Sequence, residues 1–154
     1  MKPHKEENEK YYEAFQNAAL KIFGKLAENY GLQLEQKGAD TFIIPLSSFN
    51  IKIHLAFGHL RQTNVLIIPK DTCWHTEYNE LSKNGIRLNH FVRYQNHEFP
   101  KTYYILNNTD EVRIKLQTLC DLLQKYCDPF LRGDFSIWPE VVSYVDVNIK
   151  KLIE

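Results

Sequence analysis

The first part of the chain carries apolar residues at spacings of three and four, which is the period of one face of an α-helix. This stripe runs from about Asn8 to Tyr30, and its members are Tyr12, Phe15, Ala19, Ile22, Leu26 and Tyr30. Gly31 follows directly, and glycine readily adopts the left-handed conformation that often ends a helix. The pattern predicts a long helix that packs one face on a core.

The middle of the chain changes to a period of two, which is the period of a β-strand. Apolar and polar residues alternate throughout residues 49–57. Shorter apolar segments at residues 41–46 and 65–69 predict two more strands. Pro45 would interrupt the first or restrict it to a sheet edge, and the unbroken second favours a more central position. The links between these segments are short, so an antiparallel meander is expected.

The pattern beyond residue 70 is less regular. Residues 71–85 predict a short helix that ends at Gly85. Residues 86–94 and 101–106 predict two extended segments, joined by a polar turn at residues 95–100.

Two helices are expected at the end of the chain. Asn108 and Glu111 have the spacing of a capping box, in which each side chain satisfies an exposed backbone N–H. An apolar stripe follows: Val112, Leu116, Leu119, Leu123 and Tyr126. Pro129 should end this helix, Gly133 would allow the chain to reverse, and Pro139 must lie in the first turn of the last helix. The side chain of Trp138 is expected to face the core.

These elements indicate an α+β fold in one domain spanning residues 1–154. It would consist of an N-terminal helix, an antiparallel β-meander of about four to six strands, and two C-terminal helices packed on the sheet. A chain of 154 residues with 44% apolar and 13% aromatic side chains is large and apolar enough to bury a core.

Charge and cysteine content restrict the classes of function. Nineteen basic residues balance nineteen acidic ones, which argues against a dedicated nucleic-acid binder. The charged start is unlike a secretory signal, and the apolar runs are too short to span a bilayer. Three cysteines suggest reduced thiols, so a cytoplasmic protein is expected. In the cytoplasm the sequon at residues 107–109 would not be glycosylated. The Arg132-Gly133-Asp134 tripeptide would likewise not meet the integrins that bind this motif outside the cell.

Motifs that support catalysis or metal binding are not recognisable. Cys73 and His75 are two residues apart, and Cys120 and Cys127 are seven apart, and neither spacing matches a known zinc motif. The chain has no nucleophile elbow, no Walker loop and no glycine-rich dinucleotide fingerprint. No cofactor or metal is expected, and Cys120 and Cys127 are interpreted as small buried apolar residues.

One region combines basic and aromatic side chains. Its members are Arg87, His90, Phe91, Arg93, Tyr94, His97, Phe99 and Lys101. The favoured interpretation is the solvent face of an antiparallel sheet, and the alternative is a weak RNA-binding surface. A different alternative is a small-ligand or enzyme site built around His54, His75, His90 and Arg93.

The segment LRGDFSIWPEV, residues 131–141, resembles a glycine–acidic–aromatic–tryptophan segment of small bacterial immunity proteins encoded beside polymorphic toxins. The order of helix, strands and helices is similar as well. The resemblance implies a non-enzymatic, stoichiometric inhibitor that binds its cognate toxin, with a homo-oligomer left open. The zero net charge departs from the acidic character of many partners of nuclease toxins. Large aromatic and arginine side chains are enriched at binding hot spots, so the candidate partner-binding residues are Trp74, Arg93, Tyr94 and Trp138.

Overall fold

The computed structural model describes residues 2–70 and 85–153, with side chains described for residues 6–70 and 85–147. The predicted N-terminal helix is present as α1 (Lys2–Asn29), and it begins earlier than the apolar stripe indicated. Gly31 has the expected positive φ of 69° just after it. The expected short helix over residues 71–85, including Trp74 and His75, lies outside the described residues apart from Gly85.

The middle of the chain forms the predicted antiparallel meander. Its strands are β1 (Glu35–Gly38), β2 (Thr41–Pro45), β3 (Phe49–Phe57), β4 (Arg61–Pro69) and β5 (Ile86–Arg87). They are hydrogen-bonded in the order β1-β2-β3-β4-β5, and every pair is antiparallel. β3 has the predicted bounds and buries Phe49, Ile51, Ile53 and Leu55 on one side.

Two expectations about the strands are refined. Pro45 occupies the end of β2, beyond the last residue of β2 that pairs with β1, so its missing N–H interrupts no ladder on that side. In β4, Val65 and Ile67 are buried while Leu66 and Ile68 are half-buried on the other face. The apolar run of β4 therefore does not mark a strand covered on both faces, and β3 is the central strand.

The prediction of an extended segment over residues 86–94 is wrong. Only Ile86 and Arg87 are extended, and α3 (Leu88–Gln95) follows at once. Leu88, Phe91 and Val92 are its buried residues, and their spacing of three and four is helical. Residues 101–106 form no strand and contribute a single β-bridge, between Ile105 and Gln62 of β4, so the second expected extended segment is confirmed only at that bridge.

The two predicted C-terminal helices are α4 (Asp110–Leu131) and α5 (Trp138–Ile153). The side chain of Asn108 accepts the Glu111 N–H at 3.1 Å, while the Glu111 carboxylate accepts the N–H of Asn107 at 3.2 Å, one residue earlier than a capping box requires. α4 continues past Pro129 to Leu131, with a kink where Cys127 leaves the helical conformation.

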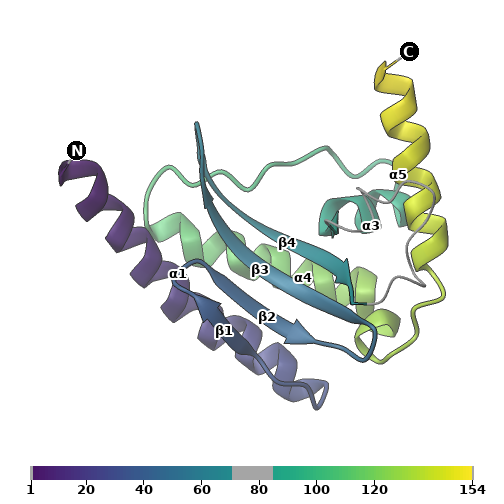
Figure 1. Ribbon diagram of the computed structural model, residues 1–154, viewed down its shortest axis with the longest axis horizontal. Helices are drawn as coiled ribbons and strands as arrows, with labels where there is room; N and C mark the ends of the chain where they lie inside the picture. The colour runs from purple at the N-terminus through teal and green to yellow at the C-terminus, as the bar shows by residue number, and fades with distance from the viewer. Residues whose placement is uncertain (1, 71–84, 154) are drawn as a thin grey trace.

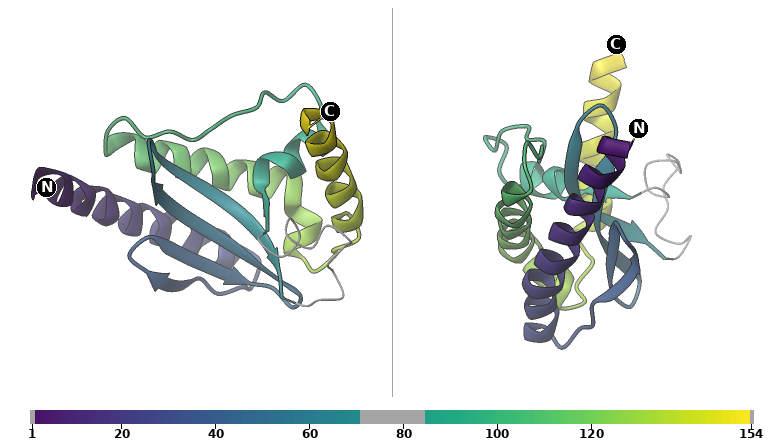
Figure 2. Two further views of the ribbon diagram at one scale, coloured as in Figure 1. Left: turned by 45° about the horizontal axis from the view of Figure 1, so that its top comes forward. Right: turned by 90° about the vertical axis from the view of Figure 1, so that its left-hand side faces the viewer.

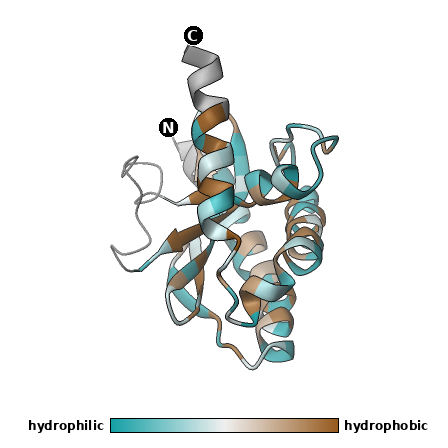
Figure 3. Cartoon of the chain, turned by 90° about the vertical axis from the view of Figure 1, so that its right-hand side faces the viewer, coloured by the Kyte–Doolittle hydropathy of each residue, from teal (hydrophilic) through white to brown (hydrophobic). Residues whose placement is uncertain are grey.

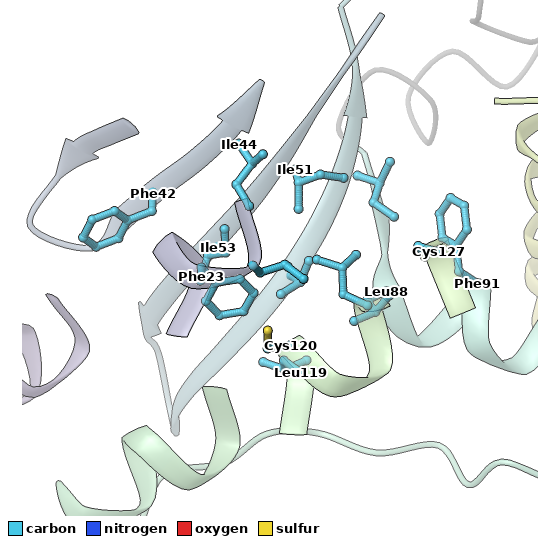
Figure 4. Close-up of a cluster of buried hydrophobic side chains, with 14 of the residues drawn as sticks. Phe23, Phe42, Ile44, Ile51, Ile53, Leu88, Phe91, Leu119, Cys120 and Cys127 are labelled. Atoms are coloured by element: carbon cyan, nitrogen blue, oxygen red, sulfur yellow. The ribbon is translucent and has the colours of Figure 1, made fainter. Parts of the chain in front are cut away.

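The helices surround the sheet unevenly. α1 and α4 lie side by side along one face, and α3 and α5 stand together at one end (Figures 1 and 2). Side chains from α1 (Phe23), the sheet (Ile53) and α4 (Leu119) converge in the core between them (Figure 4). The fold is therefore a sheet backed by two long helices, with a smaller helical pair at its end.

Candidate functional site

α3 presents two of the predicted partner-binding residues near the surface. Its inward face is anchored by Phe91 and Val92, both with no exposed area. Arg93 and Tyr94 follow on the outer side and are half-buried. The Arg93 guanidinium donates a hydrogen bond to the backbone carbonyl of Phe99, so it holds the loop that follows α3.

Tyr94 faces α5 and takes part in a cross-helix cluster. Its hydroxyl donates to the Glu140 carboxylate at 3.0 Å, which raises the pKa of the Tyr94 phenol. Its ring meets the ring of Tyr144 edge-on at a centroid distance of 5.9 Å, and His97 lies 5.7 Å from the same Tyr144 ring. Residues from two distant parts of the chain are thus brought together on one surface.

A shallow hollow of about 510 Å³ opens at this cluster, and we call it the α3–α5 hollow. Its lining residues are Tyr94, Pro139, Glu140, Ser143, Tyr144 and Val147. Most of the exposed lining is apolar, and half of Val147 is exposed. Among the side chains described for this lining, Glu140 alone is charged. Figure 3 views the molecule from this side, with α5 facing the reader and hydrophobic residues interspersed among polar ones.

Trp138 precedes Pro139 of the hollow, and its side chain lies in the core. Its side chain is 1% exposed, as expected for an inward-facing residue, and its ring contacts Phe49 at 4.8 Å and Phe91 at 6.0 Å. Phe130 and Phe135 complete this aromatic cluster against Phe49. Trp138 therefore belongs to the core, and its ring is not available at the surface. Trp74, the remaining candidate, lies outside the described residues.

The sequence pattern did not indicate the α5 half of the hollow. The residues of α5 that face the core, such as Val141 and Val145, are apolar, and they give no information about the outer face of that helix. Glu140, Tyr144 and Val147 follow each other at spacings of four and three, so they form a second stripe on the same helix. Tyr144, an aromatic residue in this otherwise mixed stripe, was the feature of the sequence that could have indicated a binding surface there.

The histidines proposed for a ligand or enzyme site have separate surroundings. His54 lies on β3, where its Nε2 is 3.7 Å from Asp40, and burial together with nearby Lys52 lowers its pKa. His90 lies on α3, where burial and the nearby cations Arg87, Arg93 and Lys101 lower its pKa. Within residues 6–70 and 85–147 the two share no charged neighbour, and neither lines the α3–α5 hollow. His75 lies outside the described residues.

The prediction that the basic and aromatic residues of the 87–101 region lie on the solvent face of a sheet is also wrong. Most of them lie on α3 and the loop after it, and their helical spacing distributes them around the helix. Phe91 is fully buried, whereas Arg87 and Lys101 are exposed. The rings and the cations therefore do not alternate along one surface, which is the arrangement that stacking on single-stranded RNA would use.

The thiols of Cys120 and Cys127 lie in the core, and the Arg132-Gly133-Asp134 tripeptide lies between two helices. Burial raises the pKa of Cys120 to about 11 and that of Cys127 to about 12, and both thiols are free. Among the described residues, no group of three or more His, Cys, Asp or Glu side chains could hold a metal ion. In the tripeptide, Gly133 has a φ of 98°, and the Asp134 carboxylate accepts the Ser136 N–H at 3.1 Å. The tripeptide forms the corner between α4 and α5.

Comparison of the chain with protein-family models, with curated proteins and with solved structures finds no match. Within residues 2–70 and 85–153, no helix combines the length and the apolar character needed to cross a membrane. The chemistry and geometry of the α3–α5 hollow are therefore the basis for interpreting its role.

Proposed function

We propose that this chain is a non-enzymatic protein-binding module that uses the α3–α5 hollow as part of its interface. The observation that carries the proposal is the cluster of the half-buried rings of Tyr94 and Tyr144 beside the exposed residues Val147 and Pro139. Tyrosine rings offer large contact areas at a low cost in conformational entropy, and they are enriched among the residues that dominate binding energy.

The shape of the hollow favours a protein over a small molecule. Sites for small molecules enclose most of the ligand surface in a deep cleft. The α3–α5 hollow is open and shallow, and its mostly apolar lining also includes the polar groups of Ser143 and Glu140. An apolar centre with a polar rim is the usual anatomy of a protein interface. A projecting side chain of a partner would fill this space.

The most specific version of the proposal is an immunity protein that neutralises a cognate bacterial toxin in the cytoplasm. It rests on the resemblance of residues 131–141 to such proteins. In this structure the same segment leads from the α4–α5 corner into the first turn of α5, which holds Pro139 and Glu140 of the hollow. Inhibition by stoichiometric binding requires a surface and no reactive group.

The test is co-expression of the chain with the product of the gene next to its own. We expect the two proteins to co-purify and the chain to relieve growth arrest caused by the neighbour. Tyr94→Ala should weaken both effects at least tenfold, because it removes an aromatic contact and leaves Glu140 unpaired. Tyr103→Ala is the matched control, since Tyr103 is 63% exposed and does not line the hollow.

Two results would contradict the proposal. If the neighbouring product neither binds the chain nor loses its toxicity, the immunity version fails. If it binds and Tyr94→Ala behaves like Tyr103→Ala, the interface lies elsewhere. Thermal unfolding of both variants checks that each is folded before binding is compared.

A further inference from the structure

A second surface feature lies between the two long helices that cover the sheet. A half-enclosed groove of about 470 Å³ runs between α1 and α4, and we call it the α1–α4 groove. Its lining residues are Lys21, Ile22, Lys25, Leu26, Asn29, Arg113, Gln117, Cys120, Asp121 and Gln124. None of them belongs to the α3–α5 hollow, so the groove is a separate site.

The floor of the groove is apolar. Leu26 and Cys120 are almost fully buried and Ile22 is half-buried, so these three side chains form the deepest part of the lining. Cys120 stays a neutral thiol at neutral pH, because burial raises its pKa. An occupant would therefore meet an uncharged surface at the bottom of the groove.

The rim of the groove is positively charged although the whole chain is neutral. Lys21 and Lys25 on α1 face Arg113 on α4, and all three are exposed. None of the ion pairs among the described side chains involves these cations. Asp121 is the one carboxylate in the described part of the lining, and it accepts a hydrogen bond from Gln117 at 2.9 Å. The rim therefore has two positive charges in excess.

We propose that the α1–α4 groove binds an acidic, amphipathic segment of a partner protein. Carboxylates of the segment would pair with Lys21, Lys25 and Arg113, and its apolar side chains would pack on Ile22 and Leu26. Charge complementarity of this kind increases association rates and fixes the orientation of the partner. Amide side chains at Asn29, Gln117 and Gln124 provide donors and acceptors for groups between the carboxylates.

The lining favours a peptide over a nucleic acid. Proteins that hold single strands combine a basic groove with aromatic side chains on which the bases stack. None of the described residues that line the α1–α4 groove is aromatic, and aliphatic side chains occupy its floor. An apolar floor between cations matches a helical segment that carries leucine and glutamate side chains on one face better than it matches a polyphosphate backbone.

Fluorescence anisotropy at low salt tests the proposal with defined probes. The first probe is a labelled helical peptide with leucine and glutamate at helical spacing. The second is the same peptide with lysine in place of every glutamate, and the third is a single-stranded oligouridine. We expect the acidic peptide to bind most tightly, with an affinity that falls as salt is added. The double variant Lys21→Glu/Lys25→Glu should weaken its binding by about tenfold or more.

A charge-matched control separates the groove from the overall charge. Lys10→Glu/Lys37→Glu changes the net charge equally, and both of its lysines are exposed outside the groove. This control should retain the affinity of the parent chain within about twofold. Equal weakening by the two double variants, equal binding of the two peptides, or tighter binding of oligouridine would each overturn the proposal. Tyr94→Ala should leave binding of the acidic peptide unchanged, so a failure of this site is distinguishable from a failure at the α3–α5 hollow.

Discussion

At the scale of single residues, the Arg132-Gly133-Asp134 tripeptide participates in internal contacts. The Arg132 guanidinium donates to the Asp128 carboxylate at 3.2 Å and lies 5.1 Å from the centre of the Tyr30 ring. The Tyr30 hydroxyl donates to the same carboxylate at 2.5 Å. Burial, with that hydrogen bond, raises the pKa of Tyr30 to about 12, and the bond lowers the pKa of Asp128. Arg132 thus helps to join the ends of α1 and α4.

Adjacent tyrosines in the segment after α3 offer a matched pair of substitutions. Tyr104 is 3% exposed and its hydroxyl donates to the Asn89 side chain at 2.8 Å, whereas Tyr103 is 63% exposed. We expect Tyr104→Phe to lower the free energy of unfolding by about 1 kcal/mol, because it removes a buried hydrogen bond. Tyr103→Phe should change it by less than about 0.5 kcal/mol. Urea denaturation at neutral pH measures both, and equal effects would contradict the assigned role of Tyr104.

At the scale of elements, the sequence predicts well where one period persists over many residues. β3 keeps its alternation for nine residues, and its bounds were predicted correctly. α3 has only eight residues, and Leu88, Phe91 and Val92 within it are compatible with either an irregular strand or two helical turns. Tertiary packing decides such a short segment, because α3 lies against both α4 and α5. The local pattern alone could not have predicted the helix.

Two glycines with positive φ mark element boundaries and differ in their surroundings. At Gly85, just before β5, an added Cβ would lie 2.6 Å from Cγ1 of Ile68 and 3.1 Å from the carbonyl oxygen of Ile67. At Gly133, in the α4–α5 corner, an added Cβ would meet nothing within 4 Å. Alanine at Gly133 introduces backbone strain alone, whereas alanine at Gly85 adds a collision with β4.

We therefore expect Gly133→Ala to lower the free energy of unfolding by about 1 kcal/mol. Gly85→Ala should lower it by roughly 2–3 kcal/mol, because the end of β4 must also shift. Thermal and urea denaturation of the two variants under the same conditions measure the difference. A loss at Gly133 as large as that at Gly85 would show that the contact with Ile68 does not decide the cost.

At the scale of the whole molecule, both proposed sites form between elements that are distant in the sequence. The α3–α5 hollow needs Tyr94 beside Tyr144, and the α1–α4 groove needs Lys25 beside Gln117. The sequence correctly predicted the helices that carry most of these residues, and it identified Tyr94. It could not predict which outer faces become neighbours, because helix pairing depends on the packing of the whole core. Arg93 and Trp138 were chosen by residue type, and their structural contacts became visible only in the fold.

The whole molecule also determines how stability depends on pH, because the folded state resists protonation of His90. Burial lowers the pKa of this imidazole from 6.5, and Arg87 of β5, Arg93 of α3 and Lys101 of the following loop lower it further. The unfolded chain binds a proton at the ordinary pKa while the folded chain does not, so stability falls as the pH drops through 6.5. The fall is complete once the pH is below the pKa in the folded state.

Replacing the imidazole should reduce this dependence on pH. We expect His90→Gln to lose less stability than the parent chain between pH 7.5 and pH 5, as measured by urea denaturation at several pH values. His59→Gln is the control, because His59 is exposed in the turn between β3 and β4, and its curve should follow the parent. His54 also has a lowered pKa, so part of the dependence should persist in the His90 variant and decrease further when both are replaced. If the parent and His90→Gln curves are parallel across this range, burial and the three cations do not lower the pKa of His90 in the folded protein.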